Sequence, residues 1–369
     1  MATSMHGTGP RHGARDYSQT PLNIYWEMTQ ACALACRHCR AEAMPEPHPN
    51  ELTTDEGLAF VSQIPSFGDP LPHLILTGGD PLARKDLYQV IDYARSIGIG
   101  ISITPAATEA LTRDVLVKLK DHGVDGLGLS LDGSTAARHD AIRGVPGTFD
   151  RTMNALRWAQ ELEMPLQVNT LVAEQTADDV PHIFELLKPF SVARWSLFFL
   201  ISVGRGKVLA ALSPEEGEKL MQWVYDVSQD SPFIVATTEA PSYRRVALQR
   251  KREQGQDAAD MKKSRATGAF GIRDGHGIMF VSNTGDICPA GFLPLTAGNV
   301  RQDKIVDIYR DSPLFKQLHD PTTFDGRCGV CEYHILCGGS RARAYGATGN
   351  PLAEDPFCPY EPLVPITRA

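Results

Sequence analysis

The sequence has no run of about 18 apolar residues, and its N-terminal stretch MATSMHGTGPRHGARDYSQT lacks the apolar segment that a secretory signal requires. We therefore expect no membrane span and a cytoplasmic protein. Positive charge is in deficit, because 44 Asp and Glu residues outnumber 36 Lys and Arg residues and give a net charge of −8. Such a chain has no general attraction to phosphate backbones, so nucleic acid is not an expected partner.

Eight cysteines are present in 369 residues, and most of them lie in two short groups, CALACRHC and CGVCEYHILC. Disulfide frameworks are typical of short secreted proteins, whereas this chain is long and shows no signal. The two groups are therefore interpreted as metal ligands. A chain of this length can form one large core and a smaller appended module.

Short apolar segments alternate with amphipathic ones, which is the pattern of repeated βα units. Parallel strands joined by helices form a barrel or an open sheet, with ligands at the carboxyl ends of the strands. The first cysteine group follows the first predicted strand, at that end. The six predicted strands begin at Leu22, His73, Gly98, Val124, Pro165 and Arg194.

The chain divides into four predicted parts. A flexible N-terminal tail covers 1–20, a core barrel 21–206, a helical linker region 207–270, and a small α+β cysteine-rich domain 271–369. The linker is predicted from a helix start near Ser213 and the charged stretch RKREQGQDAADMKKSR. The last part opens with a predicted hairpin that turns near Asn283 to Gly285.

Cys32, Cys36 and Cys39 are separated by three and then two residues, so three thiolates from one loop can bind one face of a 4Fe-4S cluster. Three protein ligands leave one iron open, and an open iron can chelate a substrate group. The alternatives are a zinc site or buried core thiols, although zinc sites usually bring a fourth ligand nearby. We interpret these cysteines as the ligands of a catalytic cluster.

CALACRHC resembles the cluster loop of the radical S-adenosylmethionine (radical SAM) superfamily, with His38 at the position beside the adenine of S-adenosylmethionine (AdoMet). GGDP also resembles the family motif that holds the methionine amino group, with Asp80 in place of the more frequent Glu. The alternative for GGDP is an ordinary turn. The cofactor contacts implied by this motif are Gly78, Gly79, Asp80 and Pro81.

SLDG at Ser130–Gly133 and HDAIRG at His139–Gly144 resemble segments that lie near the cofactor in relatives with an additional cysteine-rich domain. Ser130 and Arg143 are the candidates for contacts with the carboxylate and ribose of the cofactor. Arg143 could supply a bidentate contact, and its alternative is a surface ion pair.

The resemblance also implies a fold and a reaction. The expected fold is a partial (β/α)6 TIM-like barrel with a small C-terminal α+β iron-sulfur domain. The implied reaction is reductive cleavage of AdoMet to a 5'-deoxyadenosyl radical, which takes a hydrogen atom from the substrate in a dry site. A flavodoxin- or ferredoxin-like protein is the expected electron donor.

The second cysteine group resembles the auxiliary-cluster half of a SPASM domain over about residues 271–360. Four thiolates suffice for one closed auxiliary 4Fe-4S cluster, and zinc is the alternative. Arg341 and Ala290 stand where the full pattern has cysteines, so we expect no second auxiliary cluster, and Cys288 is interpreted as a buried, inert thiol. The four expected ligands are Cys328, Cys331, Cys337 and Cys358.

The resemblance leaves two substrate classes open, a ribosomal peptide and a haem-like tetrapyrrole. Arg205, Arg244 and Arg245 would suit carboxylates, and each could instead be a solvent-facing residue. The alternative from another class is a non-enzymatic iron-sulfur or zinc protein that senses redox state.

Overall fold

The computed structural model describes residues 15–255 and 271–363. Residues 1–14 of the predicted tail and the part of the predicted charged stretch from residue 256 onward lie outside the described residues. The described end of the tail contacts the barrel, because the Arg15 guanidinium donates to the carbonyl of Pro70 at 2.8 Å. In the described ranges, no helix is long and apolar enough to cross a membrane.

The described strands form one sheet in the order β10-β9-β8-β1-β2-β3-β4-β5-β6-β7. All neighbours from β8 to β7 pair in parallel, and β8, β9 and β10 continue the sheet in antiparallel pairs. The strands are β1 Asn23–Glu27, β2 His73–Thr77, β3 Ile101–Ile103, β4 Gly126–Ser130, β5 Leu166–Val172, β6 Val192–Phe199, β7 Ile234–Thr238, β8 Ile278–Val281, β9 Asp286–Cys288 and β10 Gly298–Asn299.

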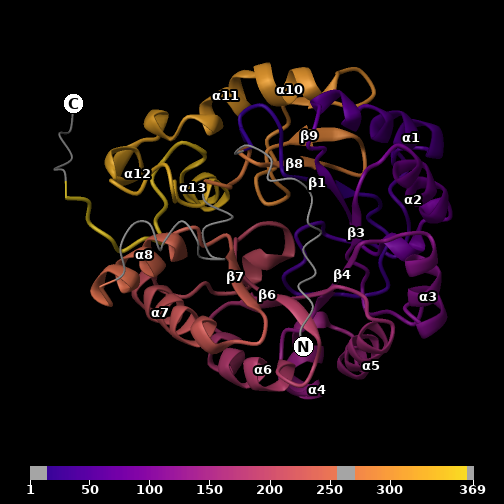
Figure 1. The fold of residues 1–369 in the computed structure, drawn as a ribbon, viewed down its shortest axis with the longest axis horizontal. Helices are drawn as coiled ribbons and strands as arrows, with labels where there is room; N and C mark the ends of the chain where they lie inside the picture. Colours follow the sequence, from indigo (N-terminus) through magenta and orange to yellow (C-terminus); the bar gives the residue numbers. More distant parts are fainter. Residues whose placement is uncertain (1–14, 256–270, 364–369) are drawn as a thin grey trace.

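Helices surround the strands on the outside (Figure 1). Those of the barrel are α1 Thr54–Ser62, α2 Leu87–Ser96, α3 Arg113–Asp121, α4 Ala136–Arg143, α5 Thr148–Glu161, α6 Val180–Leu187, α7 Pro214–Asp230 and α8 Tyr243–Glu253. The C-terminal ones are α10 Ile305–Asp311, α11 Pro313–His319, α12 Gly326–Val330 and α13 Arg341–Thr348. The capping box predicted for Thr53 and Glu56 is present at the start of α1.

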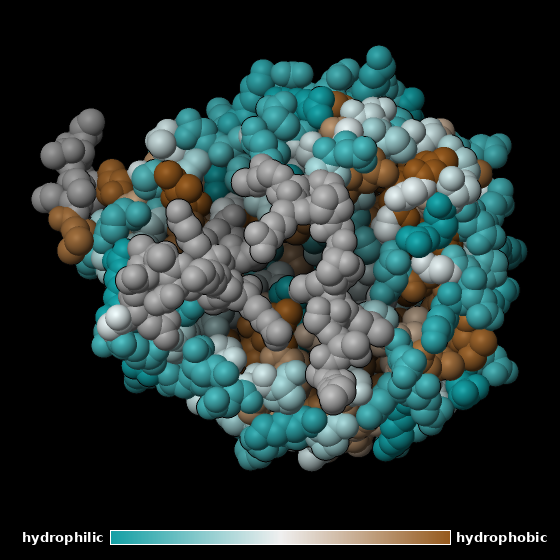
Figure 2. All heavy atoms as spheres, in the orientation of Figure 1, coloured by the Kyte–Doolittle hydropathy of each residue, from teal (hydrophilic) through white to brown (hydrophobic). Residues whose placement is uncertain are grey.

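The two faces of the strands differ in burial. On β1, Ile24 and Trp26 are fully buried on the outer face, where the Trp26 ring meets Phe60 of α1 edge-on at 5.4 Å between centroids. The alternate residues Asn23 and Tyr25 face the inside of the barrel and are only partly buried. A full TIM barrel fills its interior with branched apolar side chains. This barrel instead keeps an interior that solvent reaches, and Figure 2 shows the molecule hollowed at its centre.

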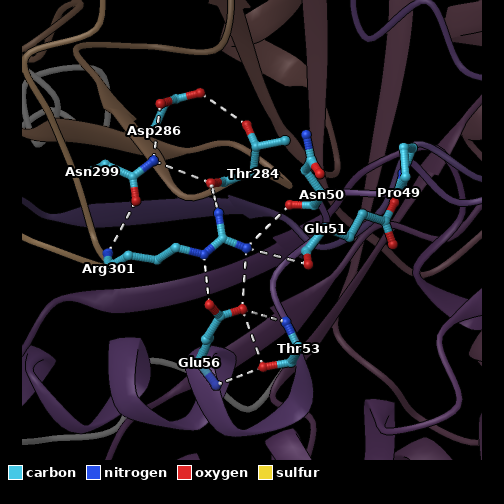
Figure 3. A pocket seen from close by; sticks show the side chains of 9 residues that line it. All are labelled: Pro49, Asn50, Glu51, Thr53, Glu56, Thr284, Asp286, Asn299 and Arg301. Atoms are coloured by element: carbon cyan, nitrogen blue, oxygen red, sulfur yellow. Dashed lines mark hydrogen bonds and ion pairs between the residues drawn. The ribbon is translucent and has the colours of Figure 1, made fainter.

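An arginine joins the C-terminal hairpin to the barrel. The Arg301 guanidinium donates to the Glu56 carboxylate of α1 at 2.6 Å and to the carbonyl of Thr284, in the hairpin turn, at 2.7 Å (Figure 3). It also donates to the carbonyl of Asn50 at 3.1 Å. This contact fixes the β8–β9 hairpin beside the start of α1.

The predicted fold class is confirmed, since parallel strands with helices on their outside form the barrel and antiparallel strands of the C-terminal region extend its sheet. Each of the six predicted strands is present. The hairpin also turns where it was expected, with Gly285 N–H donating to the carbonyl of Ser282 at 3.0 Å. The region predicted as a helical linker contributes a seventh parallel strand, β7, and β8 of the C-terminal region pairs with β1. The domain boundaries themselves stay predictions.

Candidate active site

The loop after β1 carries three of the cysteines. It is closed by two backbone hydrogen bonds, from the Cys32 N–H to the carbonyl of Met44 at 2.8 Å and from the Met44 N–H to the carbonyl of Gln30 at 3.0 Å. Because β1 ends at Glu27, the loop begins at the carboxyl edge of the sheet. That is the edge where parallel α/β folds bind their ligands.

Each thiol of this loop receives a hydrogen bond. The Cys32 sulfur accepts from the Leu34 N–H at 3.3 Å, the Cys39 sulfur from the Ala43 N–H at 3.4 Å, and the Cys36 sulfur from the Arg143 guanidinium at 3.7 Å. Cys32 also interacts electrostatically with Cys36 and Cys39, so the three thiols share one site. Donors aimed at sulfur are the pattern that tunes iron-sulfur clusters.

Burial raises the pKa of Cys32 to about 11, so its thiol is protonated at neutral pH unless a cation replaces the proton. The three cysteines of this loop fit three irons of a 4Fe-4S cluster and leave the fourth iron open. In residues 15–255 and 271–363, no group of three His, Cys, Asp or Glu residues is arranged to hold a single metal ion.

The GGDP motif packs directly on the cysteine loop. Gly79 N–H donates to the carbonyl of Thr29 and Asp80 N–H to that of Ala31, both at 2.7 Å. A Cβ at Gly79 would lie 2.4 Å from the Ala31 carbonyl oxygen, and one at Gly78, where φ is +149°, would lie 2.6 Å from that of Thr29. Only glycine permits this approach.

The Asp80 carboxylate is buried and turned toward the protein. It accepts hydrogen bonds from the Thr108 hydroxyl at 2.9 Å and from the Leu82 N–H at 3.1 Å, and the latter caps a short 3-10 turn at Pro81–Ala83. Burial raises its pKa. Its described contacts therefore brace the motif, and direct binding of a cofactor by Gly78, Gly79, Asp80 and Pro81 stays a prediction.

Arg143, at the end of α4, bridges the cysteine loop and the strand β4 side of the barrel. Its guanidinium lies 2.6 Å from the Asp132 carboxylate and also reaches Cys36. Asp132 in turn accepts from the Leu171 N–H at 2.7 Å, while its own N–H donates to Nδ1 of His139 at 3.0 Å. The alternative of a surface ion pair does not hold, because Asp132 is only 2% exposed.

Asp132 and His139 are site residues that the sequence reasoning missed. Asp132 lies in the SLDG segment and His139 in the HDAIRG segment, so the resemblance of these segments to the family could have identified both residues. Ser130, the other predicted contact, is partly buried at the end of β4, where it pairs in register with Asn169 of β5. Its role toward a cofactor stays a prediction.

His38 and Arg205 leave buried polar atoms without a partner beside the cysteine loop. Nδ1 of His38, and Nε and Nη2 of Arg205, accept or donate no hydrogen bond among the described residues. Burial lowers the pKa of His38 to about 4, which keeps its ring neutral at physiological pH. Arg205 is tied to the loop by its own N–H, which donates to the carbonyl of Cys39 at 3.1 Å. Orphaned buried groups of this kind fit a site built for a polar cofactor.

The second cysteine group is also held by N–H donors. Cys328 accepts from the Asp355 N–H at 3.3 Å, and Cys331 and Cys337 accept from the N–H groups two residues further on, each at 3.4 Å. Cys328 and Cys358 both act electrostatically on Cys331 and on Cys337, so the four thiols form one group. Burial raises the pKa of all four.

Arg341, which stands where the full pattern has a cysteine, contacts the same group. It is completely buried, and its guanidinium lies 3.5 Å from the Cys328 sulfur and 2.6 Å from the carbonyl of Ala353. Cys288 lies apart from this set and is 5% exposed. Burial raises the pKa of Cys288 to about 12, as expected of an inert thiol.

Two of the arginines suggested for substrate carboxylates are already engaged. Arg244 donates to the carbonyl groups of Leu336 and Ile272, and Arg245 lies 2.5 Å from the Glu218 carboxylate. Arg244 therefore connects α8 to the C-terminal region, Arg245 connects α8 to α7, and neither is a surface residue in solvent.

Comparison with known proteins decides the family. A protein-family model described as "Radical SAM superfamily" matches residues 26–187. AdoMet-dependent heme synthase of Oleidesulfovibrio alaskensis is 39% identical, with 96% of this chain and 93% of the relative covered. The chain belongs to the radical SAM superfamily. Radical SAM enzymes bind a 4Fe-4S cluster and AdoMet, and both predicted cofactors are thereby confirmed for the family.

Other radical SAM relatives carry different names. Fe-coproporphyrin III synthase of Methanosarcina barkeri is 30% identical, over 91% of this chain and 87% of the relative. PqqA peptide cyclase of Rhodopseudomonas palustris is 28% identical, over 93% and 88%.

Two solved radical SAM structures share the fold. Streptococcus suis SuiB bound to S-adenosylmethionine matches with a TM-score of 0.70 at 17% identity, over 93% of this chain and 78% of that chain. Native anSMEcpe with bound AdoMet matches with a TM-score of 0.68 at 16% identity, over 92% and 94%. At these identities the likeness concerns the fold alone. The rival class of non-enzymatic metal proteins is set aside, because the named relatives are enzymes.

Proposed function

We propose that this protein is a haem-forming radical SAM enzyme that converts propionate side chains of an iron tetrapyrrole into vinyl groups. The observation that carries the proposal is the full-length similarity to AdoMet-dependent heme synthase at 39% identity. The relative named for a peptide substrate is 28% identical over a similar span. The tetrapyrrole is therefore favoured over the peptide.

The chemistry follows from the structures of the porphyrins. Haem carries vinyl groups at two positions where coproporphyrin carries propionates. In the proposed reaction, the 5'-deoxyadenosyl radical takes a hydrogen atom from the propionate carbon attached to the ring. The bond to the carboxylate carbon then breaks, CO2 leaves, a carbon-carbon double bond forms, and one electron passes to an acceptor.

We assign the three cysteines of the first loop, Cys32, Cys36 and Cys39, to the cluster that cleaves AdoMet. Arg143 supports that site by balancing the charge of a Cys36 thiolate with its guanidinium. The neutral ring of His38 and the unpartnered Nε and Nη2 of Arg205 are available for polar contacts with the cofactor. The glycine motif brings backbone close to the same loop.

We assign a closed auxiliary 4Fe-4S cluster to Cys328, Cys331, Cys337 and Cys358. Four thiolates saturate such a cluster, so its role is electron transfer, and it is the proposed acceptor of the electron released with CO2. The electron that cleaves AdoMet comes from a flavodoxin- or ferredoxin-like protein. With both clusters loaded, the protein should contain about eight irons, and a Cys331→Ala variant about four.

The function is tested with anaerobically reconstituted protein, AdoMet, a reductant and iron coproporphyrin III. The expected result is haem and 5'-deoxyadenosine by mass spectrometry, and neither from the Cys36→Ala variant. Formation of 5'-deoxyadenosine with the porphyrin left unchanged would reject the tetrapyrrole substrate. Absence of both from the wild-type protein, with its iron content verified, would reject the reaction altogether.

A further inference from the structure

The inside of the barrel is lined by polar side chains, most of which have partners there. Nε2 of His73 on β2 lies 2.8 Å from the Ser102 hydroxyl of β3, and the Gln167 amide donates to Asn169 on the same strand, β5, at 2.8 Å. All four residues alternate with buried outer-face residues along their strands, so they face the interior.

Arg194 of β6 faces the same interior. Its neighbour Trp195 is fully buried on the outer face, stacked on Phe184 of α6 at 5.8 Å between centroids, and strand alternation turns Arg194 inward. Within the described part of the chain, the Arg194 guanidinium has no hydrogen bond and no carboxylate in ion-pair contact. The guanidinium is partly buried and has no partner among the described residues, so its donors are available to an anionic ligand in the barrel interior.

Tyr25 of β1 lies on the other side of the interior and interacts electrostatically with Arg194. Burial raises the pKa of Tyr25, so its phenol stays protonated and can donate a hydrogen bond at neutral pH. Arg194 on β6 and Tyr25 on β1 thus offer hydrogen-bond donors from two strands that face the same barrel interior.

The acidic groups nearest to these donors do not repel an anion. Glu239 follows β7, is hydrogen-bonded to Asp274, and accepts from the Ser340 hydroxyl at 2.6 Å. Burial raises its pKa well above the usual range, which favours its neutral form. Glu27, on β1, forms an ion pair with Arg40. Both carboxyl groups are thus engaged by partners within the protein.

We propose that Arg194 and Tyr25 bind one carboxylate of the substrate inside the barrel. The guanidinium supplies a bidentate contact and the phenol a third hydrogen bond. This assignment rests on the proposed function, because a tetrapyrrole with several propionates presents carboxylates beyond the one that reacts. One propionate held by Arg194 and Tyr25 anchors the ring, so that another can lie beside the site of AdoMet cleavage.

The experiment uses reconstituted holoenzyme titrated anaerobically with iron coproporphyrin III and, separately, with its tetramethyl ester, followed by Soret absorbance. Arg194→Gln removes the cation, and Tyr25→Phe removes one hydroxyl. The matched control is Arg157→Gln, an exposed arginine on α5. We expect Arg194→Gln to weaken binding of the acid at least tenfold and Tyr25→Phe a few-fold, with Arg157→Gln equal to the wild type.

The tetramethyl ester has no free carboxylate, so its binding distinguishes loss of the carboxylate contact from misfolding of the variant. If Arg194→Gln acts through the carboxylate, the ester binds to the variant and to the wild type equally. Equal affinity of the wild type and Arg194→Gln for the acid would overturn the carboxylate site while leaving a tetrapyrrole substrate in place. An equal loss for acid and ester would overturn it too. If the wild type binds neither compound, both the proposed function and this carboxylate site are rejected.

Discussion

The guanidinium of Arg143 lies 3.7 Å from the sulfur of Cys36, and it reaches that sulfur while paired at 2.6 Å with the Asp132 carboxylate. The cation therefore stands between a buried carboxylate and a thiol of the cluster loop. Because Arg143 ends α4, the contact also fixes that helix on the loop, where the Arg37 N–H donates to the carbonyl of Ile142 at 2.9 Å.

Replacing Arg143 by Met should destabilise the holoprotein by about 3–5 kcal/mol, because it leaves the Asp132 carboxylate buried without its cation. The double variant Arg143→Met, Asp132→Asn should recover part of the lost stability, because it leaves no buried carboxylate without a cation. Denaturation midpoints in guanidinium chloride under anaerobic conditions measure both. A single variant as stable as the wild type would contradict the role given to the pair.

Gly79→Ala should reduce the iron content of the first cluster site, because the new Cβ would lie 2.4 Å from the Ala31 carbonyl and displace the cysteine loop. Gly346→Ala is the matched control. No heavy atom lies within 4 Å of a Cβ at Gly346 in α13, and replacing a helical glycine by alanine stabilises by up to about 1 kcal/mol. Iron and sulfide analysis compares the two, and equal cluster content would count against the close packing.

Arg341→Met should lower the reduction potential of the auxiliary cluster. A buried positive charge 3.5 Å from the Cys328 sulfur favours the more reduced, more negative state, and the variant removes it. Potentiometric titration followed by electron paramagnetic resonance gives the direction, with Arg157→Met as a remote control. An unchanged or higher potential would show that Arg341 does not act on the cluster.

Arg301→Ala should lower stability by up to about 1 kcal/mol at neutral pH, since the contact is partly exposed. Hydrogen bonds from the Arg301 guanidinium, the largest cause, and from Thr53 lower the pKa of Glu56 from 4.5 to about 2. The pair's contribution is therefore complete above pH 4.5 and is lost as the pH falls toward 2. Melting temperatures at pH 7, 5 and 4 should show a constant difference between wild type and variant that begins to shrink at pH 4. A difference that grows on acidification would contradict this.

The sequence predicted the barrel because its strands and helices have clear local signals. The Thr53 and Glu56 capping box, the apolar strands and the hairpin turn near Gly285 each depend on neighbouring residues alone. Contacts between segments far apart in the sequence could not be predicted from local patterns. No local pattern indicates that Arg143 meets Asp132, or that β8 adds to β1 across more than 200 residues.

The arginines illustrate the same limit. Arg244 and Arg245 were suggested for substrate carboxylates, yet Arg244 donates to carbonyl groups of the C-terminal region and Arg245 is paired with Glu218. Arg194 was overlooked, although the alternation with buried Trp195 could have placed it inside the barrel. The sequence thus identified which residue types matter near the cysteines, and the three-dimensional contacts decided which of them are free.

The pairing of β8 with β1 gives the first strand a neighbour on each side. A chain shortened before residue 271 would lose that neighbour and leave a row of unpaired backbone groups beside the loop that carries Cys32. Truncated proteins consisting of the barrel alone should therefore associate through this open edge.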